Sequence, residues 1–170
     1  MTAPLSWLLP KTIVQESAIH GRGLFAKEKI AKGEIVAVKG GHIINGATLA
    51  QLQLGPAEVQ IGDDLFISPV TDEEREGSMI FSNHSCAANI GVRGEVTFVA
   101  IRDIAAGEEL THDWAMTDDN DDAPVECRCG AADCRKMITG KDWQRPELRR
   151  RYAGYFSTYL EKKIRHQSTR

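Results

Sequence analysis

The first 115 residues alternate between short apolar runs and glycine turns, a pattern typical of a chain built mainly from β-strands. The pattern predicts five strands, at Ile13–Gln15, Leu24–Lys27, Glu34–Val38, Leu65–Ser68 and Glu95–Ile101. Both faces of the last run are largely apolar. We therefore expect that strand to be buried on both sides.

Two short segments of the chain echo each other. Ile30–Glu34 reads I-A-K-G-E, and Ile104–Glu108 reads I-A-A-G-E. Each places a glycine, which tolerates a positive φ, directly before the start of a strand. Two copies do not make a repeat architecture, but they predict a pair of similar hairpin-like corners.

The pattern changes to helical spacing after Pro146, a residue suited to the first turn of a helix. Apolar residues then recur on one helical face, at Leu148, Tyr152, Tyr155, Phe156, Tyr159, Leu160 and Ile164. This spacing predicts one amphipathic helix whose tyrosines pack into the core. The final residues, His166–Arg170, are expected to fray.

The composition is that of an ordinary globular protein. The chain has 170 residues, of which 42% are hydrophobic and 26% are charged, with a formal net charge of −3. These values exclude a disordered chain, a collagen-like fibre and a disulfide-dense miniature scaffold. The sequence pI of about 6.0 argues against direct nucleic-acid binding.

The sequence gives no sign of membrane insertion or export. No apolar run approaches the roughly 18 residues that a membrane span needs. Leu5–Leu9 is too short for the core of a signal peptide. We therefore expect an intracellular protein, cytoplasmic in general and nuclear if the source is eukaryotic.

Charge is unevenly distributed along the chain. Residues 135–170 carry eleven Lys and Arg against three Asp and Glu, a net of +8, whereas the rest carries ten against 21, a net of −11. The acidic part includes Asp118–Asp122, which is either a solvated loop or an electrostatic guide for a basic ligand. The basic helix either contacts an acidic partner or presents a solvated face outside an aromatic core face.

Four cysteines are the most specific chemical feature. Cys127, Cys129 and Cys134 are spaced C-x-C-x4-C, and Cys86 lies 41 residues before the first of them. In an intracellular protein this spacing favours a tetrahedral zinc site over disulfides, and free buried thiols are the remaining alternative. Four thiolates leave no open position for water, so the metal would be structural and would fasten residues 127–134 to the region of Cys86.

Three further segments carry residues suited to a binding site. His20–Ala26 reads H-G-R-G-L-F-A, whose glycines either form a simple turn or let the backbone approach a ligand. Phe81–Asn89 reads F-S-N-H-S-C-A-A-N, which can hydrogen-bond a polar heterocycle or form a polar turn. Gly107–Trp114 reads G-E-E-L-T-H-D-W. An extended strand would point its His112 and Trp114 the same way.

In this order and at this spacing, the four features resemble a SET-domain protein-lysine methyltransferase. The similarity runs from about Val14 to Ile138 and is specific through the combination of motifs. Residues 83–89 match N-H-S-C-x-x-N, residues 107–114 are similar to G-E-E-L-T-x-D-Y, and the cysteine cluster matches a post-SET zinc loop. The chain therefore looks like a small stand-alone SET domain with a post-SET loop.

The resemblance implies a fold and a division of the chain. The fold would be mainly β, made of small curved sheets, with a C-terminal segment threaded beneath a loop as a pseudoknot. Residues 1–115 would form the SET core, 116–140 an acidic loop with the zinc-binding segment, and 141–170 the amphipathic helix with a basic tail.

The resemblance also implies ligands. S-adenosylmethionine would be the cofactor, and a lysine amine of a basic protein or peptide the substrate. The cofactor-binding positions fall on His20, Gly21, Arg22, Gly23, Asn83 and His84. The glycine segment and the asparagine would hold the amino-acid part of the cofactor, and the backbone of His84 would meet its adenine. In this family the cysteine of N-H-S-C is the fourth zinc ligand, here Cys86.

The chain departs from the family pattern at the expected reaction centre. Trp114 stands where the family has a tyrosine, and His112 stands where Phe or Tyr is frequent; Lys39 and His42 lie in a strand that usually carries Tyr and Glu. An indole N–H cannot accept a hydrogen bond from an amine, although its ring face attracts cations. His112 could accept a proton or orient the amine.

Two functions follow from these departures. The first is an active lysine methyltransferase that uses in-line methyl transfer, with His112 and Trp114 at the catalytic positions. The second is a SET-like binding module, weak or inactive in catalysis, that holds the cofactor or a lysine or methyl-lysine peptide.

Overall fold

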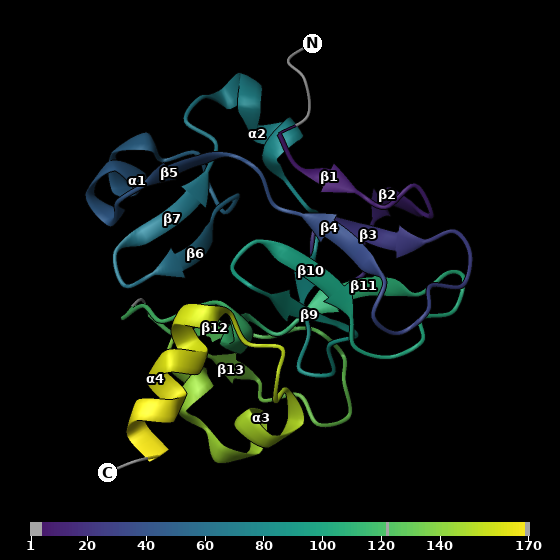
Figure 1. The fold of residues 1–170 in the computed structure, drawn as a ribbon. Coiled ribbons are helices and arrows are strands. Elements are labelled where there is room, and N and C mark those ends of the chain that lie inside the picture. Colours follow the sequence, from purple (N-terminus) through teal and green to yellow (C-terminus); the bar gives the residue numbers. More distant parts are fainter. Residues whose placement is uncertain (1–4, 122, 169–170) are drawn as a thin grey trace.

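The computed structural model describes residues 5–121 and 123–168, and shows a chain built mainly from small β-sheets (Figure 1). The strands are β1 (Trp7–Leu8), β2 (Thr12–Glu16), β3 (Arg22–Ala26), β4 (Ile35–Val38), β5 (His42–Ile44), β6 (Val59–Gly62), β7 (Leu65–Ser68), β8 (Asn83–His84), β9 (Ile90–Arg93), β10 (Thr97–Ala100), β11 (Glu109–His112), β12 (Val125–Glu126) and β13 (Met137–Ile138). The helices are α1 (Gly46–Leu52), α2 (Asp72–Ser78), α3 (Pro146–Arg151) and α4 (Thr158–Ser168), with 3₁₀ turns η1 (Trp114–Met116) and η2 (Asp142–Gln144).

The five strands predicted from the sequence are present as β2, β3, β4, β7 and β10, with small differences at their ends. Residues 98–100 of β10 are fully buried, as its two apolar faces predicted. The other strands have two to four residues. Helices α1 and α2 were not predicted, although Asn45 and Thr71 cap their first turns with side-chain oxygens.

Two four-stranded sheets form the centre of the molecule, in the orders β1-β4-β10-β9 and β2-β3-β11-β8. The sheet β5-β7-β6 lies to one side with α1, and the pair β12-β13 lies between the central strands and the C-terminal helices (Figure 1). These small sheets confirm the expected fold class. The pseudoknot-like threading stays a prediction, because strand pairing alone does not define it.

One parallel pairing brings two sequence motifs together. Strand β8 pairs with β11 in parallel, with Asn83 opposite Thr111 and His84 opposite His112. Parallel neighbours cannot be joined by a tight hairpin, so the chain makes a long excursion through β9 and β10 between them. The N-H-S-C segment therefore lies beside the end of the G-E-E-L-T-H-D-W segment.

The two echoing segments form matching corners, as predicted. Ile30 and Ile104 face each other in an antiparallel bridge with N···O distances of 3.0 and 2.9 Å. Gly33 and Gly107 take φ values of +89° and +86°. In each corner the closing glutamate accepts a hydrogen bond from the backbone N–H three residues earlier.

The prediction of one continuous C-terminal helix is wrong. The chain forms α3 and α4, separated by residues 152–157, where Gly154 has a φ of +82°. The backbone of this connection bonds to the β9 region: Val92 N–H donates to the Tyr155 carbonyl, and Thr158 N–H donates to the Gly94 carbonyl, both at 3.0 Å. Helix α4 continues to Ser168, so the expected fraying is wrong through that residue, and residues 169–170 lie outside the described part.

The C-terminal segment completes the main core. The buried cluster runs from Leu24 to Leu160 and includes Trp143, Leu148, Tyr152 and Phe156. A second cluster surrounds Cys86, Cys127 and Ile138, with Trp114 packed against it. Among the described residues, no helix combines the length and the apolar character needed to cross a membrane.

Candidate metal and cofactor site

The four cysteines meet at one place. Their Sγ atoms all lie within 4.8 Å of one another, and the Sγ atoms of Cys86 and Cys127 are 3.8 Å apart. Metal–sulfur bonds of about 2.3 Å in a tetrahedron give sulfur–sulfur distances of roughly 3.8 Å. All four thiols are free of disulfide bonds. The donor set therefore fits a tetrahedral zinc ion.

The surroundings of the thiols differ. Burial raises the pKa of Cys86 to about 11 and also raises that of Cys127. At Cys129 burial opposes ionisation, but the N–H groups of Cys86 and Ala131 outweigh it and lower the pKa to about 7. A dication must displace the protons from the buried thiols, so metal affinity should rise with pH.

His84 connects the cysteine cluster to η1. Trp114 N–H donates to His84 Nδ1 at 3.2 Å, which leaves the proton on Nε2. Nε2 lies 3.5 Å from the Sγ of Cys86 and so donates to it. Burial lowers the pKa of His84 to about 4, so the ring is neutral near pH 7. A neutral imidazole that donates to a thiolate orients that ligand.

Arg135 fastens the cysteine loop to the strand core. Its guanidinium bonds both carboxylate oxygens of Asp113, at 2.6 and 2.8 Å, and one oxygen of Asp142 at 2.9 Å. Asp113 is 0% exposed. Although burial opposes the charge, the pairing with Asp113 raises the pKa of Arg135. Sequence reasoning missed this buried ion network, because its partners are far apart in the chain.

Asn83 holds the glycine segment in place. Its side-chain amide donates to the carbonyls of His20 and Arg22, at 3.1 and 3.3 Å, and to Glu109 Oε1 at 2.7 Å. Ser17 fixes the same carboxylate at 2.8 Å. A Cβ built at Gly23 would overlap Glu109 Oε1, so any side chain here would have to displace the carboxylate that Ser17 and Asn83 hold. Glu109 is a site residue that the sequence analysis did not single out.

Arg22 closes one side of this segment. It forms a double hydrogen bond to Glu76, at 2.8 and 2.6 Å, and its guanidinium lies 4.8 Å from the centre of the Phe81 ring. Phe81 has a φ of +53°, an unusual conformation for a bulky residue. A crevice of about 330 Å³ borders this pair and is lined by Ser6, Trp7, Leu8, Glu76, Gly77, Met79 and Phe81.

His112 and Trp114 lie in different environments. His112 ends β11, is 6% exposed, bonds Ser82 Oγ through Nδ1 at 2.9 Å and packs edge-on against Phe98. Burial lowers its pKa to about 3. Trp114 begins η1 and packs against the cysteine cluster. The expectation of one extended strand through both residues is therefore wrong, since the backbone turns after Asp113, whose carboxylate caps η1.

Lys39 and His42, the other departures from the family pattern, form contacts with α2 and its end. Lys39 is 3% exposed, and its ammonium donates to the Ser78 carbonyl at 2.6 Å, at the end of α2. His42 pairs with Glu74 at 3.1 Å.

Two tyrosine hydroxyls are engaged away from His112. That of Tyr152 donates to the Cys86 carbonyl at 3.2 Å, and that of Tyr159 donates to the Thr117 carbonyl. Each hydroxyl therefore already has a backbone acceptor.

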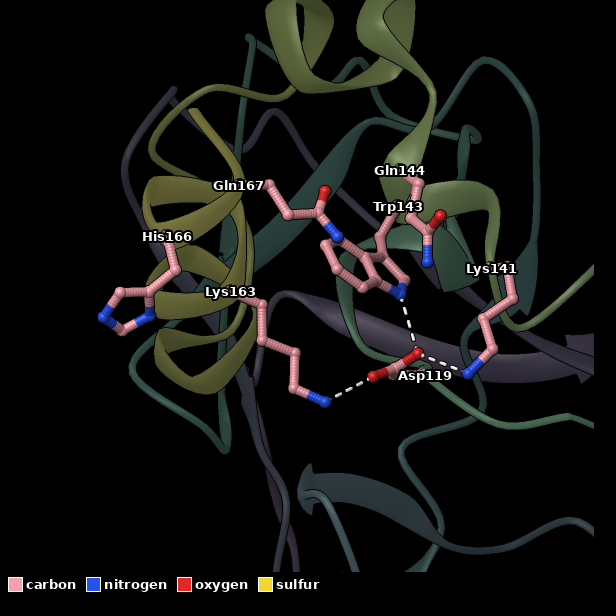
Figure 2. Close-up of a pocket in the computed structure, with 7 residues that line it drawn as sticks. All are labelled: Asp119, Lys141, Trp143, Gln144, Lys163, His166 and Gln167. Atoms are coloured by element: carbon pink, nitrogen blue, oxygen red, sulfur yellow. Dashed lines mark hydrogen bonds and ion pairs between the residues drawn. The ribbon is translucent and has the colours of Figure 1, made fainter. Parts of the chain in front are cut away.

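Asp119 changes the interpretation of the acidic run. Figure 2 shows Lys141, Trp143 and Lys163 converging on its carboxylate, at 2.8, 2.9 and 2.5 Å, beside a cavity of about 560 Å³. The side chain is 7% exposed. These donors hold its pKa below the usual value against the effect of burial. Asp119 is therefore a buried, paired carboxylate and not a solvated charge. Residue 122 of the run lies outside the described part, and the role of the run as a guide for a basic ligand stays a prediction.

Comparisons with known proteins agree with these motifs. A family model described as a SET domain matches residues 21–115, more than half of the chain. The chain belongs to the SET-domain family. It is 35% identical over 136 residues to human histone-lysine N-methyltransferase 2B, which covers 74% of this chain and 5% of that protein. It is 36% identical over 134 residues to the H3 lysine-4 specific histone-lysine N-methyltransferase of Schizosaccharomyces pombe, covering 72% of this chain and 14% of that protein.

Solved structures share the SET fold. A KRYPTONITE complex with mCHH DNA, an H3(1-15) peptide and SAH aligns with a TM-score of 0.60 and 24% identity, over 78% of this chain and 30% of that one. The methyltransferase domain of human SETMAR aligns with a TM-score of 0.58 and 22% identity, over 78% of this chain and 59% of that one. At this sequence identity these structures establish the fold alone. The DNA in the KRYPTONITE complex therefore does not test this chain, and the expectation of no direct nucleic-acid binding stays a prediction.

Proposed function

We propose that this SET-domain chain transfers a methyl group from S-adenosylmethionine to the side-chain amine of a lysine in a basic protein or peptide. The observation that carries the proposal is the parallel pairing of β8 with β11, together with the hydrogen bonds of Asn83 to the glycine segment. These contacts join three family motifs beside the four-sulfur cluster. The curated relatives are named as histone-lysine methyltransferases, which supports the same substrate class.

The glycine segment fits the amino-acid part of the cofactor. Gly21 and Arg22 are exposed residues, and no heavy atom lies within 4 Å of a Cβ built at Gly21. The Asn83 amide lies directly beside it. Exposed backbone groups next to a carboxamide suit a ligand that carries both an ammonium and a carboxylate. When bound, the cofactor supplies a sulfonium methyl group as the electrophile.

The cysteine cluster is proposed as a structural zinc centre, with Cys86, Cys127, Cys129 and Cys134 as ligands. It connects the N-H-S-C segment to the loop at 127–134, and so holds the cofactor segment against the loop that follows η1. Ionised thiolates of this kind persist in reducing surroundings, which supports an intracellular place of action.

The reaction requires a lysine amine without its proton. Its pKa is normally near 10.4, and a dry channel beside a positive sulfonium lowers it. His112 is neutral at physiological pH because burial lowers its pKa to about 3, so its imidazole can orient the amine through a hydrogen bond. Trp114 offers a ring face that attracts the substrate cation.

The test is transfer of labelled methyl groups from S-adenosylmethionine to purified histones and to an H3 peptide, using zinc-loaded protein. We expect label on lysine in the wild type, and its loss in Trp114→Ala and His112→Ala variants that retain zinc. Arg150→Met, an exposed change on α3, is the control and should transfer normally. Wild-type protein that binds the cofactor in calorimetry but transfers no label would contradict the proposal.

A binding module without turnover is the second candidate. The tyrosine hydroxyls of Tyr152 and Tyr159 are engaged elsewhere, and Trp114 packs on the cysteine cluster. Such a module would bind a trimethyl-lysine peptide more tightly than its unmodified form, through cation–π contact with Trp114. Equal affinities for the two peptides, measured by calorimetry, would exclude this form of it.

A further inference from the structure

The end of helix α3 reaches the cysteine cluster from outside the part of the chain that the SET family model matches. We propose that Arg151 is a positioning residue of the metal centre, which holds together the two chain segments that supply the sulfur ligands. This inference rests on the proposed zinc site. It assigns a role to a residue of the C-terminal segment that no family motif covers.

Arg151 contacts both halves of the site with one guanidinium group. Nη1 donates to the Cys86 carbonyl at 2.9 Å, and Nη2 pairs with Asp133 Oδ2 at 2.6 Å. Asp133 directly precedes Cys134 in the zinc loop. The planar, forked guanidinium can make both bonds at once, whereas a lysine ammonium is a single compact point of charge.

A second side chain supports the same backbone atom. Tyr152, the next residue, is 1% exposed, and its hydroxyl donates to the Cys86 carbonyl at 3.2 Å. The carbonyl therefore has two donors, and the backbone that carries the Cys86 thiol is fixed from one side. Helix α3 itself is anchored in the core through Leu148. The orientation of this ligand thus depends on the packing of α3.

Charge supports the same role. Four thiolates around a dication carry a net charge of −2, and nearby cations stabilise such a centre. Arg135 lies on one side, with its backbone N–H 3.4 Å from the Cys86 Sγ, and Arg151 lies on the side of α3. A guanidinium stays charged at any physiological pH.

The experiment measures zinc release from the full chain to a chromogenic chelator. Outer contacts of metal ligands typically change affinity about 10–100-fold when removed. We expect Arg151→Met to release zinc at least about 10-fold faster than wild type. Arg151→Lys should recover only part of the loss. Asp133→Asn, an exposed and conservative change, should also speed release, and provides the readout if Arg151→Met does not fold.

Two neighbouring arginines provide matched controls. Arg150→Met alters an exposed residue of the same helix and should leave zinc release unchanged. Arg149→Met loosens the same segment away from the metal, because Arg149 stacks over Trp143 at 5.4 Å and donates to its carbonyl at 3.0 Å. The rates of zinc release are compared at urea concentrations at which the variants have equal free energies of unfolding.

The outcomes separate this inference from the proposed metal site. If wild-type protein holds one zinc and Arg151→Met releases it no faster than Arg149→Met, the positioning role is wrong and the zinc site stands. Full recovery in Arg151→Lys would also contradict it, since a point charge would then suffice. If wild-type protein binds no zinc, the proposed metal site fails and this inference fails with it.

Discussion

Lys39 allows a stringent test of the buried charges in this fold. Its ammonium is buried beneath the end of α2, where it donates to the Ser78 carbonyl and hydroxyl. Replacing it by methionine keeps the apolar stem and removes the charge. In the variant the Ser78 carbonyl still accepts a hydrogen bond from Ser6 Oγ at 2.6 Å. The Ser78 hydroxyl still donates to the Gly40 carbonyl at 2.8 Å. Lys39→Met therefore leaves no buried group of Ser78 without a partner.

The size of the effect follows from the pKa of Lys39. Burial lowers it from an ordinary 10.5 to about 8. Between these pH values the unfolded chain binds more protons than the folded chain, so the free energy of unfolding rises with pH. At about 1.36 kcal/mol per pH unit, the Lys39 contribution grows by roughly 3 kcal/mol across this window. Below pH 8 the full cost of burying the charge is present.

The assay is urea unfolding followed by tryptophan fluorescence, at several pH values from 8 to 10.5, with zinc and reductant held constant. The measured quantity is the free energy of unfolding of the wild type minus that of Lys39→Met. Cysteine and tyrosine titrations are common to both proteins and cancel in this difference. We expect this difference to increase by roughly 3 kcal/mol as the pH rises. Lys27→Met, which changes an exposed lysine, is the control for the substitution itself. Parallel curves for wild type and Lys39→Met, or a difference that falls with pH, would refute the reasoning.

Two other predictions concern the site directly. Cys86→Ser should release zinc and raise hydrogen exchange in residues 127–138 and in α3 together, because the proposed metal and Arg151 would join these segments. Exchange that rises in only one of them would argue against a shared centre. Gly23→Ala should cost about 1–3 kcal/mol of stability, since its methyl group must displace the Glu109 carboxylate. That cost should shrink in a Glu109→Ala background, and an unchanged cost in the double-mutant cycle would count against the clash.

Local sequence patterns predicted the features that depend on neighbouring residues. The strands were visible because alternation over four or five residues has a recognisable period, and the two corners because glycine supplies a positive φ before each strand. The spacing of three cysteines predicted the metal loop. Cys86 was included because a tetrahedral site needs a fourth sulfur, and the family resemblance gave it the same role, although no local rule connects it to a loop 41 residues later.

The features that were missed depend on distant partners. The spacing after Pro146 fits one helix, but backbone bonds from residues 155 and 158 to the β9 region divide it in two. Asp119 lies in a run that looks solvated, yet it is buried by two lysines and an indole from the C-terminal segment.

The uneven charge along the sequence takes on a different meaning in the structure. Acidic residues before residue 135 pair with basic residues from 135 onward, as in Asp113 with Arg135, Asp119 with Lys163 and Asp133 with Arg151. Arg135, Lys141, Arg151 and Lys163 therefore form ion pairs within the molecule. Only the folded contacts show this complementarity.

The contact of α3 with the cysteine cluster has a consequence for folding during synthesis on the ribosome. Residues 141–168 are synthesised after all four cysteines, yet they supply the donors to the Cys86 carbonyl and a share of the main core. Under the proposed metal site, a nascent chain still lacking these residues would present four thiols to zinc without the contacts that orient Cys86. Secure capture of the ion should therefore await the emergence of α3 from the exit tunnel.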